Sequence, residues 1–172
     1  MVLKIRELSA ENARKLMEVY RESNIQNIKY FYPDIEDKDI GIKKVEKDYI
    51  SYINNDFFTD KDRCYYVLEE NGVWVSAMRF HKINDRLYYL EALETHPNYR
   101  KKGFAEKLIC GVIDKLKSQG EFEIKSYTGK ENTASQRTHE KCGFIRVEGK
   151  VFDYSTNEYV ENVINYTYYY ED

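Results

Sequence analysis

Apolar side chains recur at helical spacing in four stretches of the chain, and each stretch predicts a helix. Ser9 is a favourable N-cap for the first of them. Gly120 and Gly143 are the expected stops of the last two, because glycine readily adopts the left-handed conformation that ends a helix. The predicted helices cover residues 10–23, 42–53, 102–118 and 132–141.

The segments around the first two helices lack clean periodicity. Residues 24–35 are aromatic and polar, and Pro33 excludes a continuous helix through them, so they are expected to connect the two helices. Residues 54–63 are expected to form a polar loop.

Runs rich in Val, Ile, Tyr and Phe predict seven strands. Asn71-Gly72 is a strong hairpin signal and Asn84-Asp85 marks the next turn, so the strands on either side should form an antiparallel meander. The fifth strand follows a strand and a helix, and should therefore lie parallel to the fourth through a right-handed crossover. The predicted strands cover 2–6, 64–70, 73–80, 87–95, 122–128, 144–154 and 160–170, the last two being joined around 155–157.

This order of elements predicts an α/β fold with a mixed, mostly antiparallel twisted sheet of about seven strands flanked by about four helices. With 172 residues and no linker or repeat, the chain is expected to form a single domain over 1–172. A chain of this size buries roughly 70% of its unfolded surface, which is enough for one core.

Composition narrows the function classes. The formal net charge is −3 with 33% charged residues, so bulk charge predicts no nucleic-acid partner. The three cysteines lack metal-ligand spacing, which predicts no metal and fits a reducing compartment. No apolar run reaches membrane-spanning length, so no membrane partner and a cytoplasmic location are expected.

Three cations gather where the third predicted helix begins. Arg100, Lys101 and Lys102 precede Gly103, and a helix N-terminus offers unpaired N–H groups and the positive end of its dipole. Three cations there work against helix stability, which favours a bound anion such as a pyrophosphate. The alternative is a lysine-rich helix start without a ligand.

Two motifs resemble those of the GNAT acetyltransferases. Arg100, Gly103 and Ala105 match the family's Arg/Gln-x-x-Gly-x-Gly/Ala pattern. The stretch from Asn132 to Phe144 is similar to the family's Asn-x-x-Ala/Ser-x-x-x-Tyr-Glu-Lys-x-Gly-Phe helix. The element order also resembles the GNAT fold along nearly the whole chain, least well over 24–62.

The resemblance implies acetyl-CoA as cosubstrate, lying in a groove between the diverging fourth and fifth strands. The backbone from Leu93 to Thr95 would pair with the pantetheine arm like an added strand. The N–H groups of Lys101, Lys102, Gly103, Phe104 and Ala105 would hold the pyrophosphate. Asn132 and Ser135 are expected near the cofactor, and Asn132 also suits a simple N-cap.

The sequence departs from the family motif at His139, where many relatives carry a tyrosine proposed as general acid. An imidazolium with a pKa of about 6.5 could protonate a thiolate of pKa about 8.5. The alternatives are a histidine that packs against the cofactor or faces water, with a neighbour such as Tyr127 in its place.

A base must take the proton of the acceptor amine, and Glu91 and Glu94 are the candidates. Because strand side chains alternate, the two are expected on opposite faces, with only one facing the groove. Glu91 is slightly preferred as the base, because acidic residues at comparable places in GNAT relatives often act through a water. The alternative is one solvated carboxylate and one paired with a lysine.

The expected activity is transfer of an acetyl group from acetyl-CoA to a primary amine of a small molecule by direct attack in a ternary complex. Alternatives are a non-catalytic acyl-CoA-binding or sensor module, and an acetyltransferase acting on a protein amine. A homodimer through the last strands is a further possibility. Residues that could line an amine pocket are Asn24, Asn27, Tyr30, Tyr32 and Asp34, and the alternative is that they form a surface connection.

Overall fold

A computed structural model describes residues 1–171 of the chain. Its helices are α1 (Ala10–Phe31), α2 (Lys38–Asn55), α3 (Phe104–Lys117) and α4 (Thr133–Lys141), with short 3₁₀ helices η1 (Phe57–Thr59) and η2 (Pro97–Tyr99). Its strands are β1 (Val2–Ile5), β2 (Arg63–Glu70), β3 (Val73–Lys82), β4 (Leu87–Thr95), β5 (Phe122–Gly129), β6 (Ile145–Arg146), β7 (Val151–Asp153), β8 (Glu158–Val160) and β9 (Val163–Tyr170). None of the described helices is long and apolar enough to cross a membrane.

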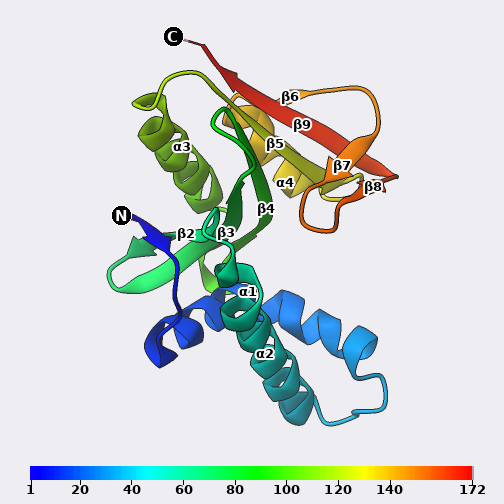
Figure 1. Cartoon of the computed structure of the whole chain (residues 1–172). Coiled ribbons are helices and arrows are strands. Elements are labelled where there is room, and N and C mark those ends of the chain that lie inside the picture. The colour runs from blue at the N-terminus through cyan, green and yellow to red at the C-terminus, as the bar shows by residue number, and fades with distance from the viewer. Residues whose placement is uncertain (172) are drawn as a thin grey trace.

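One mixed sheet organises the fold. Its strand order is β1-β2-β3-β4-β5-β9-β6, and β7 pairs with β8 in a separate hairpin. The predicted meander of β2, β3 and β4 is confirmed, as is the parallel pairing of β4 with β5. In Figure 1, α1 and α2 lie together on one side of the sheet and α3 lies on the other. The β7–β8 hairpin projects near one end of β9.

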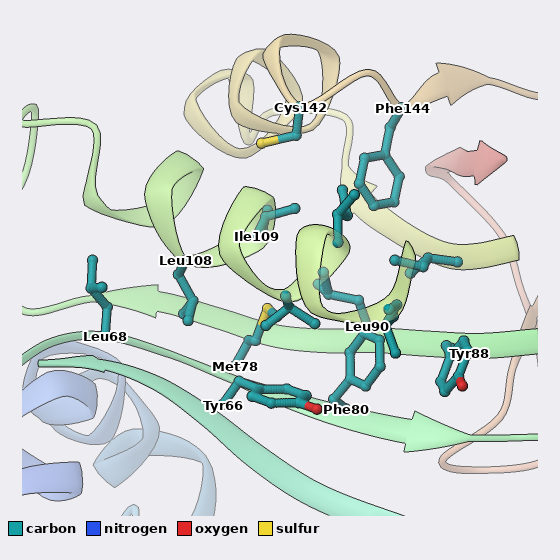
Figure 2. Close-up of a cluster of buried hydrophobic side chains, with 14 of the residues drawn as sticks. Tyr66, Leu68, Met78, Phe80, Tyr88, Leu90, Leu108, Ile109, Cys142 and Phe144 are labelled. Carbon is teal, nitrogen blue, oxygen red and sulfur yellow. The ribbon is translucent and has the colours of Figure 1, made fainter. Parts of the chain in front are cut away.

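Helices cover both faces of the sheet. Helix α3 buries its apolar stripe against β2, β3 and β4, and Figure 2 shows Leu108 and Ile109 packed over the strand side chains, with Cys142 and Phe144 at the end of α4 closing the same cluster. The other face is covered by α1, α2 and η1, where Phe57 is fully buried. Because each face has its own apolar core, a residue on β4 contacts one set of helices or the other.

Strand β4 contains a bulge at Ala92. Ala77 pairs with Glu94 and Arg79 pairs with Glu91, so Met78 faces two residues of β4. Ala92 has a φ of 50°, in the left-handed region. A bulge inserts one unpaired residue into the strand and thereby shifts the side-chain alternation beyond it.

The first helix is longer than the sequence predicted. The expected connection over 24–35 is wrong, since α1 continues to Phe31 and buries Asn24 and Ile28 on the face that carries Tyr20. The helix ends directly before Pro33, because a proline disfavours helical geometry in the residue before it. Helix α2 likewise extends beyond the predicted 42–53 at both ends.

Two irregular regions also differ from prediction. The expected polar loop over 54–63 holds η1, whose Phe57 anchors it in the core. The two long C-terminal strands, 144–154 and 160–170, are each divided: β6 has only two residues beside β9, and β7 and β8 form their own hairpin. Gly149, with a φ of 119°, lies where the first of them breaks.

Candidate functional site

The seam between β4 and β5 opens into a cavity. The two strands pair only from Leu87 to Tyr89, against Glu123 to Lys125, although both continue beyond this point. Past the last pair lies a cavity of about 180 Å³, the seam cavity. Its lining includes Thr128, whose Oγ1 is buried with no hydrogen-bond partner among the described residues.

A larger groove of about 700 Å³, the α3–α4 groove, runs between β4 and the starts of α3 and α4. No side chain caps the start of α3 at Gly103, so its first-turn N–H groups stay available to a ligand. Gly103 has a φ of 76°, and a Cβ there would meet no heavy atom within 4 Å, so backbone conformation is what requires the glycine. The predicted residues that line this groove are Leu93, Glu94, Thr95, Arg100, Lys101, Gly103, Phe104, Ala105, Asn132 and Ser135.

The three predicted cations are not equivalent. Arg100 lines the groove, forms an ion pair with Glu22, and donates from Nε to the Thr95 carbonyl at 3.4 Å. Lys101 also lines it, with a φ of 59°. Lys102 is not among the lining residues, and its Nζ lies 5.2 Å from the centroid of the Tyr99 ring. Of these three cations, the first two therefore contribute charge to the groove, which Arg137 and Lys141 also line.

Helix α4 begins at the opposite wall of the groove. Asn132 caps it by accepting a hydrogen bond from the Ser135 N–H at 3.1 Å, which confirms the N-cap. Both residues line the α3–α4 groove and the seam cavity. The structure therefore brings the second motif to the same groove as the first.

His139 is held from both ring nitrogens. Nδ1 lies 2.8 Å from the Ser135 carbonyl and therefore donates, while Nε2 lies 3.0 Å from Ser126 Oγ and accepts from it. The ring stacks on Tyr166 with centroids 5.1 Å apart and is 1% exposed. Burial lowers the pKa of His139, so the ring is neutral near pH 7. It still borders the seam cavity.

Glu91 also borders the seam cavity, and its carboxylate contacts two basic side chains. His81 Nε2 lies 2.9 Å and Arg79 Nε 3.2 Å from Glu91 Oε1. Burial alone would raise the pKa of Glu91, but the hydrogen bond from His81 and the charge of Arg79 outweigh it, so the pKa is lowered. A carboxylate held in this way is a weak proton acceptor.

Glu94 has the opposite electrostatic environment. Burial raises its pKa, and the hydrogen bond from the Ser23 hydroxyl and the charge of Arg100 offset this only in part. The expectation that Glu91 and Glu94 lie on opposite faces is wrong. The bulge at Ala92 restores Glu94 to the face of Ala77 and Arg79, which is also the face of Glu91.

A third cavity of about 470 Å³, the α1–α2 pocket, lies between these two helices and the sheet. Of the residues expected in an amine pocket, Asn24, Asn27 and Tyr32 line it. Tyr30 and Asp34 do not, since Tyr30 is an exposed residue near the end of α1 and Asp34 lies beyond the helix. Lining residues that sequence reasoning missed are Tyr20, Ser23, Phe31, Val45, Asp48, Tyr49, Tyr52, Arg79 and Ala92. The signal that could have found those on α1 was the helical spacing of Tyr20, Ser23, Asn27 and Phe31.

The three cavities adjoin one another. Ser23 and Glu94 line both the α3–α4 groove and the α1–α2 pocket. Ala92 lines both the α1–α2 pocket and the seam cavity. The arrangement can therefore hold one ligand along the groove and a second in the pocket, with their ends meeting at the bulge of β4.

The buried carboxylate of Asp153 is hydrogen-bonded to tyrosines of both β4 and β5. Asp153 of β7 accepts hydrogen bonds from Tyr127 at 2.9 Å and Tyr89 at 3.2 Å. Burial, and then the bond to Asp153, raise the pKa of Tyr127 to about 12. Tyr127 lines the seam cavity and keeps its proton at neutral pH.

A sequence profile of the Acetyltransferase (GNAT) family matches residues 28–144, which is more than half of the chain. The chain belongs to the GNAT family. The expected GNAT fold is likewise confirmed, since the PaiA N-acetyltransferase from Thermoplasma acidophilum, solved with coenzyme A, superimposes with a TM-score of 0.64 over 99% of both chains at 18% identity.

Other GNAT-type acetyltransferases show local or extended similarity. An aminoglycoside N(6')-acetyltransferase type 1 from Salmonella typhimurium is 36% identical over 64 residues, which are 37% of this chain and 44% of that protein. The match thus spans less than half the length of that relative. The N-alpha-acetyltransferase 30 from Saccharomyces cerevisiae is 30% identical over 155 residues, covering 81% of this chain and 82% of that protein.

The GNAT motif residues suit a coenzyme A moiety. Helix α3 presents an uncapped N-terminus beside Arg100 and Lys101, which fits a diphosphate. The orphaned hydroxyl of Thr128 in the seam cavity fits the polar arm that would end there. Among residues 1–171, no group of three or more His, Cys, Asp or Glu side chains is placed to hold a metal ion.

Proposed function

We propose that this protein transfers an acetyl group from acetyl-CoA to a primary amine of a small molecule in a ternary complex. The observation that carries the proposal is that Glu94 lines both the α3–α4 groove and the α1–α2 pocket. A carboxylate with a raised pKa thus stands where donor and acceptor would meet.

Acetyl-CoA would lie along the α3–α4 groove. The first-turn N–H groups of α3, with Arg100 and Lys101, would bind the pyrophosphate, and the backbone of Leu93 to Thr95 would pair with the pantetheine arm. The limited pairing of β4 with β5 supports this, because it leaves the end of β4 open to an added strand. Asn132 and Ser135 would border the same arm.

The reaction is a direct exchange at an acyl thioester, the electrophile that acetyl-CoA supplies. The amine nitrogen forms a bond to the carbonyl carbon, the bond from that carbon to sulfur breaks, and the electron pair leaves on the thiolate. The nitrogen loses one proton and the thiolate gains one, so the products are an acetamide and free thiol. Backbone N–H groups freed by the bulge at Ala92 would stabilise the oxyanion.

Glu94 is the proposed proton acceptor, directly or through a water. Its raised pKa makes it a stronger base than Glu91, which the charge of Arg79 and a hydrogen bond from His81 already stabilise as a carboxylate. Glu91 would instead fix Arg79 in the wall of the pocket.

Tyr127 is the proposed proton donor to the thiolate. Its hydroxyl is protonated at neutral pH and lines the seam cavity. The general-acid hypothesis for His139 has less support, because burial keeps the ring neutral near pH 7 and its Nε2, which accepts a hydrogen bond from Ser126, carries no proton to donate. His139 would hold α4 against β5.

The test combines binding and turnover. Acetyl-CoA at a hundredfold excess over Kd should stabilise the fold by about 2.7 kcal/mol, seen as a rise in Tm. Thiol release with an amine panel should then be detected. Glu94→Gln should lower kcat/KM by about a hundredfold, since general base catalysis contributes roughly 10²–10⁴. In the wild type, kcat/KM should fall with falling pH as Glu94 is protonated, at a pH above the ordinary range of a glutamate.

Glu158→Gln, an exposed carboxylate of β8 outside the three cavities, is the matched control and should keep wild-type turnover. Binding without thiol release on any amine would favour the non-catalytic acyl-CoA module. Full activity in Glu94→Gln would remove this residue from the role of base.

A further inference from the structure

The α1–α2 pocket carries an excess of negative charge. Its charged lining residues are Asp48, Glu94 and Arg79. The charge of Arg79 is balanced by Glu91, with Nε 3.2 Å from the carboxylate. Lys44, an exposed residue of α2, places its Nζ 4.9 Å from the Tyr32 ring centroid.

The two carboxylates belong to different walls of this pocket, Glu94 to β4 and Asp48 to α2. Glu94 receives a hydrogen bond from Ser23 and also borders the α3–α4 groove. Asp48 receives one from Tyr32 and does not border that groove.

The wall between the two carboxylates is aromatic. Tyr20, Tyr49 and Tyr52 line it, and Tyr20 and Tyr49 pack edge to face with centroids 5.6 Å apart. Aromatic rings bury an alkyl chain and also attract a cation through their π faces. The pocket thus offers an aromatic wall together with two carboxylates.

We propose that the acceptor is a small dication, a linear alkyl diamine whose reacting nitrogen lies at Glu94 and whose second, protonated nitrogen lies at Asp48. The inference rests on the proposed function and names the substrate class of the same site. The tyrosines of the pocket would cover the alkyl chain that joins the two nitrogens.

The experiment compares diamines with monoamines of equal chain length. Putrescine and cadaverine are measured against n-butylamine and n-pentylamine by thiol release at saturating acetyl-CoA. We expect kcat/KM to be at least tenfold higher for each diamine. Asp48→Asn should shrink that ratio about fivefold, because an exposed ion pair contributes at most this much. Asp48→Glu keeps the charge and should preserve most of the preference.

Asp39→Asn is the control, since Asp39 is an exposed carboxylate of the same helix that does not line the pocket. It should leave the diamine-to-monoamine ratio unchanged. Equal use of diamines and monoamines, or acetylation of a peptide amine but of neither diamine, would overturn the inference while leaving acetyl transfer intact. Absence of thiol release with every amine would instead count against the proposed function.

Discussion

The environment of His139 illustrates what a single residue's identity leaves open. Its position in the motif is fixed by sequence, but the bonds to the Ser135 carbonyl and Ser126 hydroxyl depend on the packing of α4 against β5. The imidazole is therefore a neutral, buried group that joins two elements. Chemistry inferred from the residue type alone would assign it a proton that its surroundings remove.

The pH dependence of the free energy of unfolding should show that His139 is neutral in the folded protein. The folded pKa of His139 lies below the unfolded value of about 6.5, so stability from this residue is complete above about pH 6.5. As pH falls toward the folded pKa, only the unfolded chain gains a proton, and the free energy of unfolding decreases. His139→Gln should cost about 1–3 kcal/mol near pH 8, through lost hydrogen bonds and packing.

Urea unfolding of both proteins from about pH 8 to about pH 5.5 measures the effect. Subtracting the two curves cancels the other titrating groups, and the difference should narrow as the pH falls. A constant difference would show that His139 is not held neutral.

At the scale of elements, the bulge in β4 decides which side chains share a face. Alternation along 87–95 places Glu91 and Glu94 apart, and nothing in the letters Glu-Ala-Leu-Glu announces an extra residue. The bulge follows from the pairing with β3, since Met78 faces both Ala92 and Leu93. The periodicity of a sequence predicts which side chains alternate along one strand, but a bulge depends on how two strands pair.

The left-handed backbone of Ala92 makes the bulge testable. A β-branched residue there meets steric strain that alanine bears at lower cost, so Ala92→Val should destabilise the protein by about 1–2 kcal/mol and reduce turnover. Ala92→Gly is the matched control, because glycine adopts this conformation freely. Urea midpoints measure both; an Ala92→Val protein as stable as the wild type would show that the bulge is not strained.

Some of the other elements could be predicted from local sequence, whereas others depend on contacts with distant parts of the chain. The Asn71-Gly72 hairpin and the strand–helix–strand crossover into β5 were predictable because their signals are local. The extension of α1 through Ile28 was hidden by polar and aromatic residues that face the α1–α2 pocket. The β7–β8 hairpin could not be predicted, since the residues of β7 look like a continuation of the strand before them.

At the scale of the whole molecule, the motif residues at the starts of α3 and α4 line one groove because β4 and β5 stop pairing and diverge. Gly103 and Asn132 are 29 positions apart in sequence, yet both line this groove. Most of the residues that the motifs predicted for a cofactor line this groove, and their role stays a prediction. The pocket between α1 and α2 was predicted only in part, because it needs the tertiary contact of the two helices with the bulged strand.

Hydrogen exchange can locate the donor in the intact protein. Acetyl-CoA should slow amide exchange over 92–95 of β4 and in the first turn of α3, because the proposed contacts use these N–H groups. The β7–β8 hairpin lines neither the α3–α4 groove nor the α1–α2 pocket and should exchange at an unchanged rate. Mass spectrometry of peptides measures this, and protection confined to the hairpin would refute the placement.

The three-residue seam between β4 and β5 has a consequence for the protein in its cell. On the proposed placement, the pantetheine arm completes a ladder that the polypeptide leaves unfinished, so the donor is also a piece of the architecture. When the thioester is scarce, the protein would then be less stable as well as inactive, and proteases would cut it more readily. Metabolic supply would in this way set the lifetime of the protein along with its rate.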